Sequence, residues 1–384
     1  MTESPGADAA IVGGGPVGTA LAIALARSDV RAVLLESRVP ATAPTDPRPI
    51  ALSYGSRLIL ERLNVWEALG RTTPIERIHV SQQGGFGHAL MAADRAGLPA
   101  LGYVVEYARL QNALTAALQA ARGFAVYGAQ VTAIHGDHEK AAVDYHDAEG
   151  ERTLIARVVI IADGGAVSGA TTKVIDYHQA AVVAVVSSEL PHGGTAFERF
   201  TPEGPLALLP CGKDLALVWS MKAEAAMACA AEPTDTFLAR LHRAFGGRVG
   251  RFTAVGARLT YPLALRIGRA AMPRTLYVGN ASQTLHPVAG QGFNIGLRDA
   301  WELSAQIRDA ERGTLGTSPM LEACEKRRRL DRRGGTVFTD ALVRIFSNDF
   351  PPLRAARGLG LAALDALPPA KDVLVRRMIF GARG

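Results

Sequence analysis

Two short apolar runs near the start of the chain flank a segment with helical composition. Residues 8–12 (Asp-Ala-Ala-Ile-Val) and 30–36 (Val-Arg-Ala-Val-Leu-Leu-Glu) lack the polar alternation of a half-exposed strand. Such runs are typical of strands that are buried on both faces of a parallel sheet. Residues 20–27 lie between them and favour a helix. The pattern predicts a strand–helix–strand unit and an α/β fold.

Helical and strand patterns alternate through the rest of the chain. Residues 107–121 are predicted to be a helix, because leucines four residues apart mark one face. Helices are also predicted at 53–69, after a loop at 40–49, and at 291–312, and the chain beyond is mostly helical in composition. Strands are predicted at 124–134, 141–146, 153–162, 180–188, 194–220, 252–263 and 275–279.

Composition narrows the class of protein. The 384 residues are 48% hydrophobic and 20% charged, with a net charge of +6, which suits about two globular domains. Three widely spaced cysteines predict neither a disulfide framework nor a metal site, and a reducing cytoplasm fits them. The N-terminus does not resemble a signal peptide. No apolar run reaches the ~18 residues that a membrane span needs.

A glycine-rich turn follows the first predicted strand. It consists of Gly13, Gly14, Gly15, Pro16, Val17 and Gly18. In a G-x-G-x-x-G turn the first glycine permits a tight bend and the second lets the backbone approach a pyrophosphate. The third lets the following helix pack closely on the strand. The strand before it and the helix after it predict a dinucleotide site. The alternative is a turn that binds nothing.

An acidic residue, Glu36, ends the second predicted strand. An acid at this position accepts hydrogen bonds from the ribose hydroxyls of adenosine and repels a 2′-phosphate. It therefore favours FAD or NAD over NADP as the bound nucleotide. The alternative is a surface acid without a ligand.

A distant segment distinguishes FAD from NAD. Residues 277–282 (Tyr-Val-Gly-Asn-Ala-Ser) and 285–296 (Leu-His-Pro-Val-Ala-Gly-Gln-Gly-Phe-Asn-Ile-Gly) are a strand, a polar turn and glycines that open a helix. Such a helix start offers a second set of free backbone N–H groups. They suit the ribityl chain, the pyrophosphate and the pyrimidine edge of a flavin. An NAD dehydrogenase has no use for such a second site.

At this point the chain resembles the group A flavoprotein aromatic hydroxylases. The matching residues are Asp163 in the Asp-Gly motif, then Gly279, Asn280, Pro287, Gly290, Gln291, Gly292 and Asn294. The resemblance implies that these residues bind FAD. It also implies a Rossmann-type FAD-binding domain, a mixed β-sheet substrate domain and a helical C-terminus. We expect the FAD domain at 1–75, 100–175 and 270–340, the substrate domain at 76–99 and 176–269, and the helical segment at 341–384.

Further segments resemble the ubiquinone-biosynthesis hydroxylases, in particular the 2-polyprenyl-6-methoxyphenol hydroxylases. They are residues 46–52, 196–201, 204–207, 261–265 and 280–287. Two positions depart from the wider superfamily, and both departures resemble this branch. Asn280 stands where most relatives carry Asp, and Thr171 stands where an arginine follows the Asp-Gly motif. Docking of the nicotinamide at that arginine, which the wider superfamily would imply, therefore cannot be transferred to this chain.

The resemblance implies a reaction and its partners. NAD(P)H would reduce FAD, and O2 would then form a flavin C4a-hydroperoxide that hydroxylates the ring of a polyprenylated phenol. The substrate's tail predicts an apolar pocket, for which residues 180–188 and 206–219 offer side chains. The alternative is that these side chains form the domain's own core. No nucleic acid is expected as a partner. The cytoplasm is expected as the location, with contact to the inner membrane or to a biosynthetic complex left open.

Three single residues carry open alternatives. His286 is a candidate proton handler, but a structural hydrogen bond is the favoured explanation of a loop histidine. Arg48 is expected to reach the flavin or cover its exit, with a solvent-exposed arginine as the alternative. Gln111 is expected to touch FAD or to lie on a solvated helix face. The sequence names no catalytic base.

The C-terminal part contains a basic and an apolar stretch. Residues 326–333 hold six arginines and lysines around one acid, which predicts a solvated helix face, with contact to anionic lipid or an acidic partner as the alternative. Leucines after residue 353 predict packing on the protein's own core, with an interfacial helix as the alternative.

Other functions on the same fold stay open at this point. They are hydroxylation of a soluble phenol, halogenation, prenyl reduction, and a non-catalytic flavin-binding subunit. A halogenase would show a Trp-x-Trp-x-Ile-Pro segment, whereas Trp66, Trp219 and Trp301 are isolated.

Overall fold

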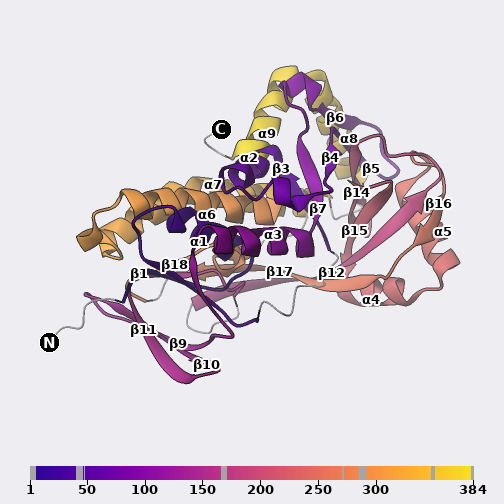
Figure 1. The fold of residues 1–384 in the computed structure, drawn as a ribbon. Helices are drawn as coiled ribbons and strands as arrows, with labels where there is room; N and C mark the ends of the chain where they lie inside the picture. Colours follow the sequence, from indigo (N-terminus) through magenta and orange to yellow (C-terminus); the bar gives the residue numbers. More distant parts are fainter. Residues whose placement is uncertain are drawn as a thin grey trace.

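The chain begins with the strand–helix–strand unit that its pattern predicts. The structure, a computed structural model, describes residues 6–39, 46, 48–165, 171–269, 272–284, 291–346 and 351–381 (Figure 1). Strand β1 (Ala7–Val12) is buried along its whole length, α1 (Pro16–Ala26) follows it, and β2 (Ala32–Glu36) pairs with β1 in parallel. The α/β fold prediction is confirmed.

A seven-stranded sheet extends this unit, in the order β8-β2-β1-β11-β10-β9 with β18 beside β11. Its other strands are β8 (Phe124–Tyr127), β9 (Gln130–Gly136), β10 (Ala141–Asp147), β11 (Gly150–Ile161) and β18 (Thr275–Tyr277). Helices α1, α3 (Tyr107–Ala120) and α6 (Gln291–Asp309) share one hydrophobic core with the sheet. Segments far apart in the sequence thus meet at the ends of β1, β2 and β11.

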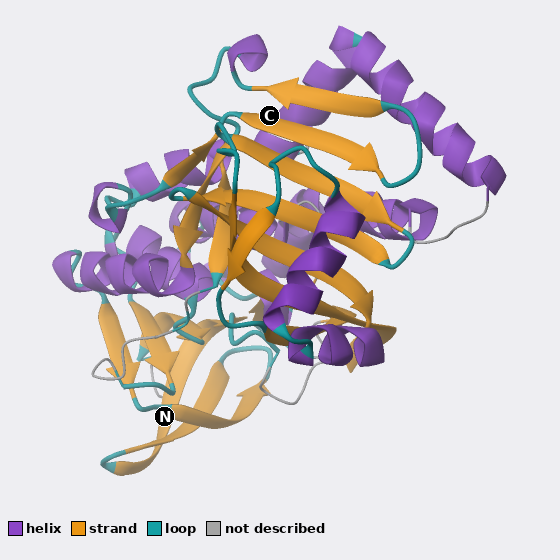
Figure 2. Ribbon diagram, turned by 90° about the vertical axis from the view of Figure 1, so that its right-hand side faces the viewer, coloured by secondary structure: helices purple, strands orange, loops and turns teal. Residues whose placement is uncertain are grey.

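A second sheet of nine strands has the order β19-β17-β12-β15-β14-β13-β5-β6, with β16 beside β12. Its strands are β5 (Arg77–Gln82), β6 (His88–Ala92), β12 (Thr171–Ser188), β13 (Thr195–Thr201), β14 (Gly204–Cys211), β15 (Asp214–Lys222), β16 (Phe252–Val255), β17 (Leu259–Arg269) and β19 (Gln283–Thr284). Figure 2 shows these strands flanked by helices. The predicted domain boundaries stay a prediction.

Helices α4 (Ala223–Ala231) and α5 (Thr234–Phe245) cover one face of the second sheet and were not predicted. They enclose large side chains of the strands, including Val182, Leu206 and Trp219. These residues come from the segments expected to line a substrate pocket. The alternative, that most of them form the domain's own core, is therefore the correct one.

A small third sheet joins β3 (Pro49–Ser53), β7 (Gly102–Glu106) and β4 (Thr73–Ile75). Helix α2 (Tyr54–Arg62) begins directly after β3 in the sequence. The Ser53 side chain caps its start by accepting a hydrogen bond from the Ser56 N–H. The single helix predicted at 53–69 is wrong in its second half. Asn64 has a φ of 57°, which ends the helix before a short 3₁₀ turn at Glu67–Leu69.

The C-terminal part is helical, as predicted, and consists of α7 (Ser318–Phe346), α8 (Pro351–Ala366) and α9 (Pro368–Phe380). Helix α8 lies beside β5 and β6, and α9 packs against α2 and β3 (Figure 1). Leu361 packs against Ala89 and Phe200, so the tail contributes to the protein's own core. None of the helices within the described ranges is long and apolar enough to cross a membrane.

The basic stretch in α7 is only partly the solvated face that was predicted. Lys326, Arg327 and Arg329 are exposed. Arg328 is instead fully buried and bonds to Glu325 and the carbonyl of Tyr277. The solvated interpretation is therefore wrong for Arg328.

One buried histidine makes the second sheet sensitive to acid. Burial, together with nearby Arg248 and His88, lowers the pKa of His79 to about 4 from 6.5. Between pH 6.5 and about pH 4, the His79 side chain takes up a proton in the unfolded chain but not in the folded chain. The free energy of unfolding therefore falls as the pH drops through this range. At pH 5 the loss is about 2 kcal/mol relative to pH 8. His79→Leu should shrink the difference between the unfolding free energies at these two pH values by this amount, measured by urea titration. The exposed His146→Leu should leave it unchanged, and an identical result for both variants would contradict the assignment.

Candidate active site

Three of the four glycines in the turn after β1, Gly13, Gly14 and Gly18, leave no room for a side chain. A Cβ on Gly13 would lie 2.6 Å from the Cα of Asp163, and the φ of Gly13 is +104°. A Cβ on Gly18 would lie 2.0 Å from the carbonyl oxygen of Gly13. A Cβ on Gly15, in contrast, would have no atom within 4 Å. The turn therefore folds tightly around Gly13 and Gly18, while Gly15 faces open space at the start of α1.

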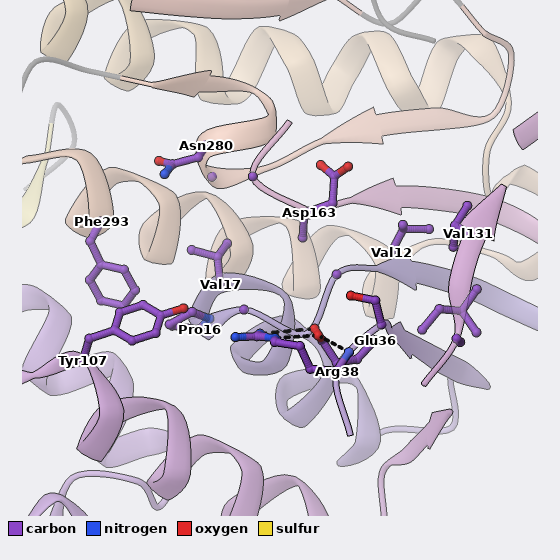
Figure 3. Close-up of a pocket in the computed structure, with 18 of the residues that line it drawn as sticks. Val12, Pro16, Val17, Glu36, Arg38, Tyr107, Val131, Asp163, Asn280 and Phe293 are labelled. Atoms are coloured by element: carbon purple, nitrogen blue, oxygen red, sulfur yellow. Dashed lines mark hydrogen bonds and ion pairs between the residues drawn. The ribbon is translucent and has the colours of Figure 1, made fainter. Parts of the chain in front are cut away.

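That open space is a cleft of about 860 Å³ at the carboxyl ends of β1, β2 and β11, the edge where open α/β sheets bind ligands. The predicted site residues that line it are Gly13, Gly15, Pro16, Glu36, Arg48, Asp163, Gly279, Asn280 and Gly292. They come from parts of the chain far apart in sequence. In Figure 3, Glu36 and Asn280 lie on opposite sides of the cleft.

Glu36 is buried at the end of β2 and holds the glycine turn. Its carboxylate accepts hydrogen bonds from the N–H of Gly14 (2.5 Å) and from the Nε of Arg38 (2.7 Å). Burial alone would raise the pKa of Glu36, but the hydrogen bonds from Arg38 and Gly14 lower it below its ordinary value. The acid is therefore ionised at neutral pH. Arg38 also lines the cleft, and the sequence argument missed it although it lies two residues away.

The opposite wall is built around the start of α6. A Cβ on Gly296 would lie 3.0 Å from the Cα of Gly279, so the first turns of α6 pack closely on the turn at Gly279–Ala281. Gly292 lines the cleft, and a Cβ there would meet no atom of the described residues within 4 Å beyond its own turn of helix. The cleft thus has an open glycine at two helix starts, Gly15 for α1 and Gly292 for α6. Both helices direct N–H groups toward it.

Arg48 lies between the two sheets. Its guanidinium carbon is 5.4 Å from the ring centre of Tyr107 in α3 and 4.8 Å from that of Tyr261 in β17. Its Nε donates to Asp46 at 2.7 Å. The alternative of a purely solvent-exposed arginine is wrong, because Arg48 is half-buried and lines the cleft. Sequence reasoning assigned no site role to either tyrosine, although Tyr261 opens one of the segments that resemble the ubiquinone-biosynthesis hydroxylases.

Some predicted contacts lie beside the cleft rather than in it. Gln111 is buried and donates to the carbonyl of Gly14 at 2.9 Å, so the solvated alternative is wrong. Asn294 is buried as well. Its side chain accepts from the N–H of Ser53 (2.8 Å) and donates to the carbonyl of Ala51 (3.0 Å), which ties α6 to β3. Gln291 is buried at the start of α6.

Three predicted residues lie outside the described part of the chain. They are His286, Pro287 and Gly290. The roles expected for them stay predictions.

The chain is similar to known proteins over nearly its whole length. The model of the FAD binding domain family matches residues 6–333. Ubiquinone hydroxylase UbiL of Rhodospirillum rubrum is 35% identical, over 96% of this chain and 89% of the relative. The 3-demethoxyubiquinol 3-hydroxylase of Escherichia coli is 32% identical, over 95% and 96%. The crystal structure of p-nitrophenol 4-monooxygenase PnpA from Pseudomonas putida has the same fold, with a TM-score of 0.78 at 17% identity over 98% and 99% of the two chains.

The fold, the cleft and these similarities define an FAD-dependent monooxygenase. The residues fit the cofactor, since the open glycines leave room for a pyrophosphate and Glu36 suits a ribose. The chain belongs to the FAD binding domain family and, within it, to the FAD-dependent hydroxylases of ubiquinone biosynthesis. FAD, when bound, takes up hydride and activates oxygen. The resemblance found in the sequence is thus confirmed.

Glu36→Ala is expected to weaken FAD binding by about 1–3 kcal/mol, the range for a lost charge-assisted hydrogen bond. Glu36→Gln should lose less, because an amide oxygen can still accept one bond. Calorimetric titration of the apoprotein with FAD measures both, with the exposed Glu67→Gln as control. Equal affinities in all variants would show that Glu36 does not contact the adenosine.

Proposed function

We propose that the protein hydroxylates the aromatic ring of a polyprenylated phenol in ubiquinone biosynthesis, with FAD, NAD(P)H and O2. The observation that carries the proposal is the FAD cleft in a chain that aligns over at least 95% of its length with two ubiquinone-pathway hydroxylases. The resemblance found in the sequence favours a 2-polyprenyl-6-methoxyphenol as the substrate. The chain's own part is to hold the ring beside the cofactor and to exclude water.

We propose that FAD lies across the cleft, with its adenosine at Glu36 and its flavin at Gly292. The pyrophosphate would then lie at Gly15, where none of the described residues fills the space of a side chain. The turn of Gly279 and Asn280 would hold the ribityl chain. Gly18 and Gln111 would act indirectly, because they shape the turn rather than line the cleft.

An apolar cavity of about 60 Å³ next to the cleft supports a prenylated substrate. Gln291 and Asn294 at the start of α6 form one side of it, and Met91 in β6 and Met378 in α9 form another. We propose that the first part of the prenyl tail enters here, because flexible methionines adapt to a branched hydrocarbon. The tail would also bring the enzyme to the surface of the inner membrane from the cytoplasm.

The test uses the FAD-loaded enzyme and a short-chain prenylated phenol. We expect the phenol to stimulate NAD(P)H oxidation and to gain one oxygen atom from labelled O2, detected by mass spectrometry. A prenyl-free phenol of the same ring pattern is the matched control and should react more slowly. Equal rates would favour a soluble-phenol hydroxylase. No stimulation and no label would favour a non-catalytic flavin subunit.

A further inference from the structure

A second cavity, of about 510 Å³, lies at the β13-β5-β6 edge of the nine-stranded sheet. Its lining residues are Ser81, Gln82, Gly85, Gly87, His88, Arg199, Phe245, Gly246, Gly247 and Arg248. None of them lines the FAD cleft. The cavity is therefore a separate feature, to which the proposed hydroxylation assigns no role.

The lining is basic and contains no acid. Arg199 comes from β13, His88 from β6 and Arg248 from the loop after α5. Arg248 is exposed, and its side chain makes no hydrogen bond or ion pair within the part of the chain that the structure describes. Arg199 donates only to neutral groups, the carbonyl of Ala244 at 3.0 Å and the hydroxyl of Ser81 at 3.2 Å. These two bonds fix the guanidinium without neutralising it.

Neighbouring residues do not supply the missing negative charge. Asp365, an acid that interacts with His88, already binds Lys371 at 2.8 Å and the N–H of Leu90 at 3.0 Å. Behind His88, the ring of His79 stacks at 5.2 Å and an angle of 13°. Both ring nitrogens of His79 are buried without a hydrogen-bond partner. Among the described residues that line the cavity, no acid offsets the two arginines, so the cavity attracts an anion.

We propose that this cavity binds a phosphate group, either a monoester or a diester. Two guanidinium groups and an imidazole approach from three elements, which suits a tetrahedral oxyanion with several acceptor atoms better than a planar carboxylate. Four glycines line the remaining wall, so the backbone can come close to the ligand. The site recognises phosphate and not the rest of the ligand.

The phosphate can come from a free nucleotide or from a phospholipid headgroup. The rim bears on this choice, because Phe86 is 56% exposed in the turn beside Gly87. In α8, the backbone of Gly358 contacts the backbone of Phe86 and Gly87. The next residue, Leu359, is 62% exposed. Both sources present the same chemical group, and the experiment separates them.

The test titrates FAD-loaded enzyme, with the main cleft occupied, at constant ionic strength. One arm uses inorganic pyrophosphate in a calorimeter, and the other uses phosphatidylglycerol vesicles in a flotation assay. We expect saturable binding that Arg248→Gln weakens about tenfold or more, as for a lost charge-assisted bond. His88→Gln should weaken it as well. The matched control is Arg251→Gln, an exposed arginine three residues away that does not line the cavity.

Each outcome decides the proposal. Binding of pyrophosphate that depends on Arg248 supports a site for free phosphates. Binding of the vesicles alone, with the same dependence, supports a lipid headgroup. Absence of binding in both arms would overturn the proposal, and so would equal losses in Arg248→Gln and Arg251→Gln.

Discussion

Gly15→Val is expected to give a folded but colourless protein that does not bind FAD. Apart from its chain neighbours, no atom of the described residues lies within 4 Å of the place where a Cβ would stand, so this part of the chain accommodates the side chain. The valine would instead fill the part of the cleft that the pyrophosphate needs, at the start of α1. Flavin absorbance after reconstitution measures the loss, and far-ultraviolet circular dichroism measures the fold. We expect affinity to fall by at least about a hundredfold, since a branched side chain and a pyrophosphate cannot share one volume.

Two other glycines serve as controls for this prediction. Gly18→Val should prevent folding, because its Cβ would lie 2.0 Å from the carbonyl oxygen of Gly13. Gly313→Val should neither unfold the protein nor release FAD, since its Cβ also meets no atom and lies outside the cleft. If Gly15→Val binds FAD as well as the parent does, the pyrophosphate does not lie at this turn.

The parts of the site that follow from local sequence were predicted well. A buried strand, a glycine turn and a helix are short-range patterns, and they fixed the positions of Gly13, Gly15 and Gly18. Glu36 was also predictable, because the second strand of the unit pairs with the first in a constant parallel arrangement. The start of α6 was recognised by its glycines and not by its position in space.

The parts that depend on long-range contacts could not be predicted. Gln111 bonds to Gly14, 97 residues away, and Asn294 bonds to Ser53, 241 residues away. No periodicity in either segment specifies such a partner. The small sheet of β3, β7 and β4 was missed for the same reason, because short strands gain their stability from pairing with distant ones. These bonds place Gln111 and Asn294 in the wall of the cleft, and the contacts with FAD expected for them stay predictions.

Arg328→Met is expected to lower the free energy of unfolding by about 3–5 kcal/mol, the range for breaking a buried ion pair by removing one partner. Arg328 is fully buried and joins three elements of the flavin-binding half. It bonds to Glu325 in α7 at 2.6 Å, donates to the carbonyl of Tyr277 at 3.2 Å and lies 3.8 Å from Asp299 in α6. Methionine fills a similar volume but leaves Asp299 buried without this arginine. Urea titration at neutral pH measures the change.

The neighbouring Arg329→Met is the matched control, because it removes the same charge from the same helix. Arg329 is exposed, and surface substitutions of this kind change stability by about 0.5 kcal/mol or less. Loss of the buried Arg328 contacts should also disturb the cofactor site, since Tyr277 ends the strand that leads to Gly279. We therefore expect Arg328→Met, and not Arg329→Met, to weaken FAD binding at temperatures where both variants are folded. Equal stability of the two variants would mean that α7 does not hold Asp299 and Tyr277 through Arg328.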